Sequence, residues 1–226
     1  MAGPGRLAAM LTSRALALVT CAAALTACTS SDAGHTDIAN VFEVKSTFDS
    51  GFQVTTSGPT GIDPKLLAPQ TVPAGVKIEP ADCAKFAAGL AIPQGAQGNM
   101  AATTAEGKGN RFIAIAVETS EPVPPNDPGP NCQMVAFGGP GVRGLVEVVE
   151  SPQIEGARVL GTHRVVQTTM DGKPHSGELF NYVASFDSYL VIVTANPLVV
   201  PNTPVAPVDT AKARELLTAA VAAVRG

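Results

Sequence analysis

The sequence predicts an α+β domain in which an antiparallel sheet, built mainly as a meander, carries helices packed on one face. Two patterns support this. Apolar and polar residues alternate in several stretches between positions 100 and 195, as they do in half-buried strands. Residues 209–226 instead repeat apolar residues at the spacing of an amphipathic helix. We expect a sheet of about five to seven strands, with the C-terminal helix and a helix around Cys83 on the same face, and one disulfide.

The beginning of the chain has the layout of a secretory signal. Arg6 and Arg14 are the only charged residues in 1–14, and 15–24 is an uncharged run rich in Ala and Leu. Such a run is too short for a helix that must cross about 30 Å of hydrocarbon. We therefore predict a signal segment that is removed rather than a transmembrane anchor.

The end of this segment, Leu25-Thr26-Ala27-Cys28, has the small residues before a cysteine that are typical of a lipoprotein processing site. We predict a lipoprotein signal peptide over 1–27, acylation of Cys28 with palmitate-type chains, and a location at the outer face of the plasma membrane. An ordinary cleaved signal with a chance cysteine, or an uncleaved anchor, are the alternatives.

The remaining chain is expected to contain a flexible tether, 28–36, and a single extracytoplasmic α+β domain, 37–226. The total length of 226 residues agrees with one ordinary domain. The formal net charge is −4 and no basic run is present, so the composition excludes a nucleic-acid partner.

Two of the four cysteines lie in the signal region and two in the expected domain. Cys21 leaves with the signal and Cys28 takes the lipid, so Cys83 and Cys132 have only each other. In an oxidising compartment such a pair predicts a structural disulfide. Closing a loop of about 50 residues would stabilise the fold by roughly 4 kcal/mol. A free reactive thiol or a metal ligand is the alternative.

The first half of the domain is expected to alternate helices with short strands. Thr36 or Asp37 can cap a helix that ends before Asp49. A half-buried strand over 51–56 and an irregular loop over 58–75 follow. The apolar positions of the first helix are Ile38, Val41, Phe42 and Val44.

Pro80 suits the first turn of a second helix, which Pro93 and Gly95 close. Its apolar face holds Cys83, Phe86, Ala87 and Leu90. The sheet begins near Met100, and 111–119 is its first clear strand.

A loop over 121–130 is predicted because it contains five prolines in ten residues. Segments 131–137 and 145–149 then flank a glycine-rich stretch, 138–144, and predict a hairpin with a wide loop.

The clearest strands are 158–170, 178–186 and 189–195. Asp171-Gly172 and Asp187-Ser188 predict tight turns between them. Leu190 to Val193 is apolar on both faces, which indicates a central strand. After a proline-spaced crossing over 196–207, Asp209 can cap the last helix. The apolar positions of that helix are Ala213, Leu216, Leu217, Ala220, Val221 and Val224.

Candidate chemistry is sparse. Gly139, Gly141 and Gly144 match the G-x-G-x-x-G nucleotide pattern, but a strand follows where a helix is required, so a glycine hairpin is favoured. The three histidines are His35, His163 and His175.

His163 or His175 could form a metal site with Asp171 or Glu178, although solvated histidines are the favoured interpretation. The sequence has no G-x-S-x-G elbow. Serines nevertheless lie in the expected turns Asp49-Ser50-Gly51 and His175-Ser176-Gly177, so a hydrolase remains an alternative. We predict no catalytic, cofactor-binding or metal-binding residue and no cofactor.

The export signal, the opening helix, the segment 48–54 and the Cys83/Cys132 pair before a meander resemble mycobacterial cell-envelope lipoproteins of unknown function. More distantly, the chain is similar to the extracellular sensor domain of a mycobacterial serine/threonine kinase. That resemblance implies an α+β module with a ligand cleft over about 38–225. The sensor family carries two disulfides, whereas this chain can form one and lacks Trp. No functional residue transfers.

These patterns predict a lipid-anchored, non-enzymatic binding or sensing domain of the cell envelope. The strands are apolar on both faces, so we expect an apolar cleft between the sheet and the loops 58–75 and 121–130, occupied by a hydrophobic envelope molecule. The expected partners are the membrane, through the lipid anchor, and that ligand or a membrane protein. An envelope hydrolase and a structural adaptor for a membrane protein are the alternatives.

Overall fold

A computed structural model describes residues 35–62, 75–93, 96–170 and 172–226. These residues belong to one compact unit. The signal peptide 1–27, Cys28 and most of the tether 28–36 lie outside the described residues, as do Asp171 and most of the expected loop 58–75. Among the described residues, no helix has both the length and the apolar character needed to span a membrane.

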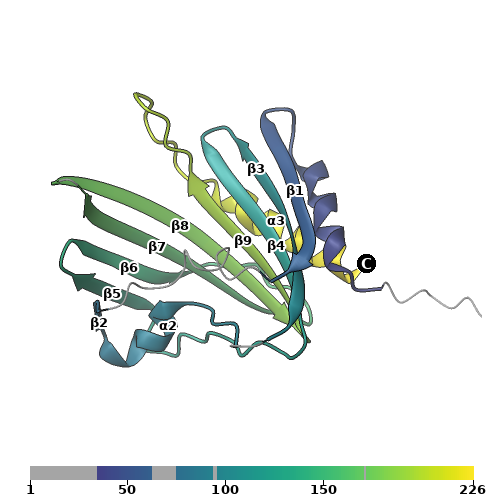
Figure 1. The fold of residues 1–226 in the computed structure, drawn as a ribbon, viewed down its shortest axis with the longest axis horizontal. Helices are drawn as coiled ribbons and strands as arrows, with labels where there is room; N and C mark the ends of the chain where they lie inside the picture. The colour runs from purple at the N-terminus through teal and green to yellow at the C-terminus, as the bar shows by residue number, and fades with distance from the viewer. Residues whose placement is uncertain (1–34, 63–74, 94–95, 171) are drawn as a thin grey trace, which may run out of the picture. The chain divides into compact units, whose positions relative to one another are not determined.

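The described residues form one antiparallel sheet of nine strands, in the order β1-β3-β4-β9-β8-β7-β6-β5-β2 (Figure 1). Strands β5 to β9 are a meander, and β9 then pairs with β4 of the β3–β4 hairpin, so it lies inside the sheet as predicted. The bounds are β1 Phe52–Gly61, β2 Lys77–Glu79, β3 Gly98–Gly107, β4 Asn110–Thr119, β5 Met134–Gly139, β6 Val142–Val149, β7 Arg158–Met170, β8 Lys173–Phe186 and β9 Tyr189–Pro197.

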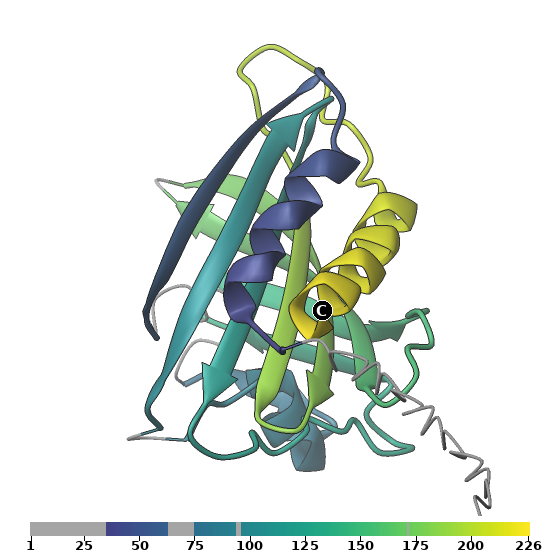
Figure 2. The same cartoon turned by 90° about the vertical axis from the view of Figure 1, so that its right-hand side faces the viewer.

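Two helices cover one face of the sheet (Figure 2). The 3-10 helix η1, Ile38–Thr47, starts where the Asp37 carboxylate accepts a hydrogen bond from the Ala39 amide at 2.8 Å. The helix α3, Thr210–Arg225, starts where the Asp209 carboxylate accepts from the Lys212 amide at 2.9 Å. Both predicted caps are confirmed.

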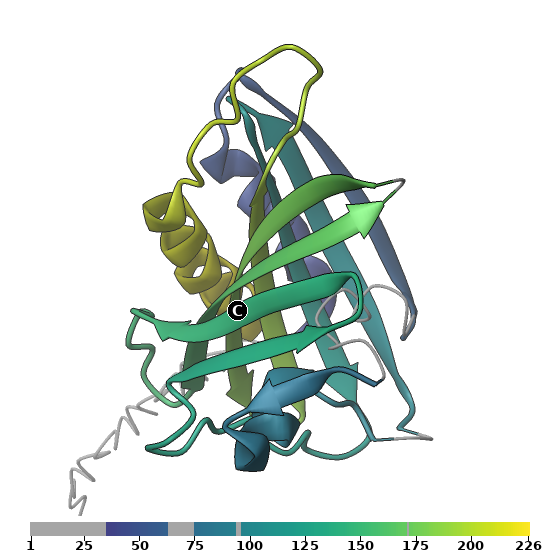
Figure 3. The ribbon, with the colours of Figure 1, turned by 90° about the vertical axis from the view of Figure 1, so that its left-hand side faces the viewer.

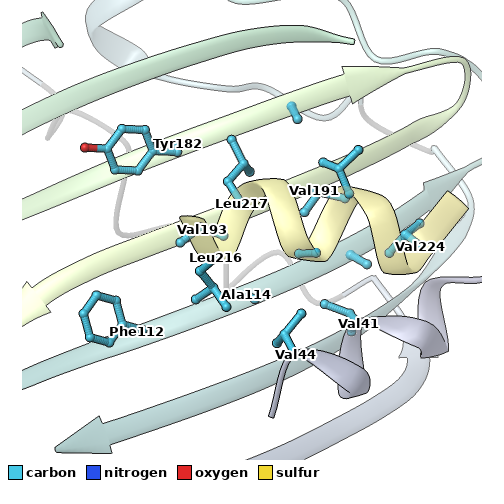
Figure 4. Packing of buried hydrophobic residues seen from close by; sticks show 14 of the residues in the cluster. Val41, Val44, Phe112, Ala114, Tyr182, Val191, Val193, Leu216, Leu217 and Val224 are labelled. Carbon is cyan, nitrogen blue, oxygen red and sulfur yellow. The ribbon is translucent and has the colours of Figure 1, made fainter. Parts of the chain in front are cut away.

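All six predicted apolar positions of α3 are buried. Figure 4 shows Leu216 and Leu217 of α3 beside Val191 and Val193 of β9, with side chains of η1 completing the cluster. The largest core of the described domain therefore lies between these two helices and the centre of the sheet.

The Cys83 helix is shorter than predicted and lies elsewhere. It consists of η3, Ala81–Cys83, and α2, Ala84–Ala88. Phe86 and Ala87 pack with Val146 of β6. Val146 pairs with Arg164, which pairs with Leu179, and paired residues share a face.

On β8, the face that carries Leu179 is opposite to the one that carries Tyr182 and meets α3. The expectation that both helices pack on one face is therefore not confirmed, since α2 covers the second face (Figure 3). The physical reason is that both faces of the sheet are apolar, and each needs its own cover.

The predicted disulfide is confirmed. Cys83 and Cys132 are bonded, with their Cα atoms 5.5 Å apart and 49 positions apart in the chain. The bond ties the start of α2 to the segment that leads into β5, and both cysteines are buried.

Two predicted loops are shorter in the structure. Strand β1 continues to Gly61, into the segment expected to be irregular. The β5–β6 hairpin turns over Pro140 and Gly141 alone, since Gly139 pairs with Val142, so the wide glycine loop is corrected to a two-residue turn. Gly144 lies inside β6. The Phe137 ring occupies the space that a side chain at this position would need, which accounts for the glycine.

His175 and its neighbours belong to β8, where His175 pairs with Thr168, and not to a turn. The three-residue strand β2 pairs with β5 and was not predicted. It is too short to show an alternating pattern.

Candidate functional site

A cavity of about 410 Å³ lies on the second face of the sheet, on the side away from η1 and α3. Its floor is formed by β7, β8 and β9, and its walls by α2 and the segment 121–130. The structure thus shows a cleft between the sheet and 121–130, one of the two loops predicted to close it, whereas most of the other loop, 58–75, lies outside the described residues. Its volume falls in the range of about 300–1,000 Å³ that is usual for small-molecule sites.

The floor is apolar at its centre. Leu160 and Val183 face each other across the β7–β8 pair, and Leu190 adds a third aliphatic side chain from β9. These residues follow the period of two, which places every second residue of each strand on this face. An apolar molecule on this floor would remove aliphatic surface from water, at about 25 cal/mol per Å².

One wall is the segment 121–130, which contains no helix or strand. Pro124, Pro125 and Pro128 line the cavity. The prolines lack backbone donors, so they can present ring carbons to a ligand without leaving an N–H group unpaired.

Two side chains hold this wall in place. The Asn126 amide donates to the Phe86 carbonyl of α2 at 3.1 Å. The Asp127 carboxylate accepts from Arg158 of β7 at 2.6 Å, in an exposed ion pair that contributes about 0–1 kcal/mol. The wall is therefore joined both to α2 and to the sheet.

A positive charge lies at the buried end of the cavity. Arg164 is only 8% exposed although it lines the cavity, and its Nη2 donates to the Ala87 carbonyl at 2.8 Å. Its guanidinium carbon lies 5.7 Å from the centre of the Phe137 ring. Burial lowers the pKa of this guanidinium from its usual value. Arginine nevertheless stays charged in proteins.

Polar side chains accompany this charge. Thr162 and Asn181 form a cross-strand pair and line the cavity next to Arg164. The Thr162 hydroxyl lies 3.5 Å from the Asn181 carbonyl, to which it donates. The cavity thus joins an aliphatic and proline-lined part to a polar end that carries one buried cation.

Arg164 falls within a predicted strand and is not among the candidate site residues of the sequence analysis. Its position in the alternating pattern could have identified it, because Leu160, Thr162 and Val166 lie on the same face of the strand. An arginine on a face that becomes covered must be paired or must bear the cost of burial. Only the pairing of β7 with β6 and β8, and the position of α2, place that face beneath a wall.

The predicted histidine candidates are not among the residues that line the cavity, and of the predicted metal-site pairs the structure brings His163 and Glu178 together. His163 points away from the cavity, with Nδ1 2.8 Å from Glu147 and Nε2 3.2 Å from Glu178, and its ring stacks on Phe180 at 4.1 Å. His175 is exposed on β8. Asp171 lies outside the described residues. Within the described ranges, no group of three or more His, Cys, Asp or Glu side chains is arranged to hold a metal ion.

The serine candidates are also dispersed. Asp49 accepts from the Gly51 amide at 2.8 Å, which closes the turn around Ser50. The hydrogen bond from Lys108 and the one from Gly51 lower the pKa of the Asp49 carboxyl. His175 and Ser176 are neighbours on β8, so their side chains point to opposite faces. The structure therefore does not join a serine to a histidine at either place.

Comparisons with known proteins agree with this fold. A family model, "Domain of unknown function (DUF5642)", matches residues 37–225. Among solved structures, the chain is similar to the X-ray structure of an uncharacterised protein from Mycobacterium smegmatis, the Rv0999 ortholog. The two are 65% identical, with a TM-score of 0.80 over 84% of this chain and 98% of that chain. No curated protein matches the chain.

Proposed function

The chain belongs to the DUF5642 family, a mycobacterial family of unknown function, and we propose that this member is a lipid-anchored binding domain that takes a hydrophobic molecule of the cell envelope. The observation that carries the proposal is the cavity of about 410 Å³ between the sheet and the proline-rich wall. Its centre is aliphatic, and it lies in the position where the apolar strands predict a cleft.

The anchor is the second part of the proposal. Acylation of Cys28 would hold the domain at the outer face of the plasma membrane, next to a pool of envelope lipids. The resemblance to the extracellular sensor domain of a mycobacterial kinase supports the same kind of role, because that module has a ligand cleft. Binding, rather than catalysis, is favoured since the cavity contains no paired nucleophile and base among the described residues that line it.

The test is recovery of a bound molecule. The full chain, purified from its own envelope and examined by native mass spectrometry, should carry a lipidic molecule. Lipid extract added to the emptied protein should raise Tm, because a ligand at 100 times its Kd stabilises the folded state by about 2.7 kcal/mol.

Val183→Phe should reduce lipid binding, because a larger side chain at the floor of the cavity would occupy the space of the ligand. Val205→Phe, in an exposed segment, should leave binding unchanged. A chain that carries no lipid and shows no shift with lipid extract would contradict the proposal.

A structural adaptor for a membrane protein is the second candidate, and one observation favours it. Val199, Val200 and Val205 are 74%, 52% and 54% exposed in the segment between β9 and α3. Residues 196–208 contain no charged side chain, so this apolar surface could meet a protein partner. Cross-linking in the envelope tests it: a Val199→Ser and Val200→Ser chain should lose its cross-linked partner and keep its bound lipid.

A further inference from the structure

We propose that the cavity ligand is an anionic amphiphile, whose oxyanion headgroup is bound by Arg164 while its hydrocarbon chain lies along the floor formed by β7 and β8. The inference rests on the proposed function and narrows it to one chemical class, molecules with a carboxylate or phosphate head and an apolar chain.

The charge of Arg164 is only partly compensated. Burying a cation is costly unless it is paired, and a residue that is 8% exposed has lost most of its hydration. Among the described residues, Arg164 forms no ion pair with an acidic side chain; the ion pairs found there join other residues. Within the described part of the chain, Arg164 donates a hydrogen bond to the Ala87 carbonyl and lies over the Phe137 ring. Both offer partial negative charge, and neither neutralises the cation.

Several hydrogen-bond donors of the Arg164 guanidinium remain available. A guanidinium carries five N–H groups, and the hydrogen bond to Ala87 uses one of them. In the described part of the chain, no buried side-chain nitrogen or oxygen lacks a hydrogen-bond partner. The Arg164 nitrogens without a hydrogen bond are therefore accessible rather than enclosed, and Arg164 lines the cavity. Their planar fork matches the two oxygens of a carboxylate or phosphate.

Charged and aliphatic side chains follow one another in a fixed order along β7. From Arg158 to Arg164, β7 extends about 20 Å. Arg158 at one end is exposed and already paired with Asp127, whereas Arg164 at the other end is buried. Leu160 lies between them, opposite Val183. An amphiphile would therefore place its head at Arg164 and its chain over the aliphatic residues.

The structure also offers a role for Arg164 without any ligand, which is to satisfy the end of α2 through the Ala87 carbonyl. The test must therefore separate charge recognition from folding. Ligands that share one chain and differ only in the head make this possible, because a purely structural arginine would not distinguish them.

The experiment is displacement of Nile red, a neutral apolar dye, from the purified full chain. The competitors are hexadecanoic acid, hexadecyl phosphate and hexadecanol, each below its micelle-forming concentration, with sodium phosphate and sodium acetate as heads without a chain. The wild type should bind one or both anionic amphiphiles about 10- to 100-fold more tightly than the alcohol, which is the usual gain from a hydrogen-bonded charged group. The relative affinity of acid and phosphate identifies the headgroup, and the salts without a chain should bind far more weakly.

Arg164→Met keeps an apolar stem and removes the charge, so it should bind acid and alcohol equally. Arg164→Lys keeps the charge without the fork and should retain part of the preference. Arg143→Met is the matched control, because Arg143 is exposed on the other face of β6, and it should keep the full preference.

Equal affinity of the wild type for acid and alcohol would overturn this inference and leave the hydrophobic-ligand proposal standing. A preference that survives in Arg164→Met would also overturn it. Failure of all three chain-bearing competitors to displace the dye would contradict the proposed function itself. The comparison of acid with alcohol needs only the wild type, so the inference can be decided even if Arg164→Met does not fold.

Discussion

Among single residues, two glycines in strands differ in the space around the position where a Cβ would lie. Gly144 of β6 lies where a Cβ would collide with the Phe137 ring and the Val165 carbonyl. Gly177 of β8 has open space around the position of a Cβ. Neither has a positive φ, so the difference between them is one of packing and not of backbone conformation.

Gly144→Ala should therefore destabilise the domain by about 1–3 kcal/mol, the usual cost of overpacking. Gly177→Ala should be neutral or slightly stabilising, because alanine restricts the unfolded chain more than glycine does. Urea denaturation of the two variants measures the difference. Equal midpoints would show that the Phe137 ring and the backbone at Val165 can both shift without cost.

At the scale of the elements, the helix α3 combines a local start signal with a buried face. Its cap is set by Asp209, whose carboxylate accepts from Lys212 and whose amide donates to the Asn110 side chain. The cap thus holds the helix to the start of β4 as well as satisfying the first turn.

Asp209→Ala should cost about 1 kcal/mol of unfolding free energy, since the first-turn amide loses its acceptor. Glu215→Ala, at an exposed position inside α3, is the matched control and should change stability by no more than about 0.5 kcal/mol. Thermal and urea unfolding measure both. A control that loses as much stability as Asp209→Ala would indicate that helix propensity, and not the cap, decides the effect.

The disulfide links the short helix α2 to a segment that is distant in the sequence. It fastens α2 to the segment before β5 across 49 positions, and α2 itself has only five residues. Short helices are marginal in isolation, so α2 depends on such a link and on its contacts with the sheet.

Replacing both cysteines by serine should lower the unfolding free energy by roughly 4 kcal/mol, because the unfolded chain regains the entropy of an open loop. The same change should weaken binding in the cavity, since α2 forms one of its walls. Peptide mapping without reductant should find one bridged pair in the wild type. Two free thiols at Cys83 and Cys132 there would contradict the pairing.

At the scale of the whole molecule, the two faces of one sheet have different covers. Helices η1 and α3 fill one face with a continuous hydrophobic core. The other face receives a five-residue helix, a disulfide and a proline-rich segment, which leave a cavity between them. A binding role fits the second face because the first already supplies a core without it.

The predicted lipid anchor concerns the location of the whole protein. Cys28→Ala should abolish acylation and leave the chain unprocessed or released from the membrane, since the thiol is the group that carries the lipid. Mass spectrometry of the N-terminus and fractionation of the envelope check this. An unacylated mature N-terminus in the wild type would contradict the proposed location.

Features that depend on local chemistry can be predicted from the sequence alone. The six apolar positions of α3 share a face because 3.6 residues complete a helical turn, and all six are buried. The alternation around Tyr182 in β8 and the apolar run in β9 follow from the period of two. The disulfide followed from elimination, because Cys83 and Cys132 had no other partner.

Which elements meet one another becomes visible only in the folded domain. The face that α2 covers, the pairing of the short strand β2, and the burial of Arg164 depend on contacts between distant segments, and no local period encodes them. Arg164 carries the same period of two as its neighbours in β7, and it becomes a buried cation only because α2 and β8 surround it. The candidate site therefore arises from the way that both faces of an apolar sheet are covered.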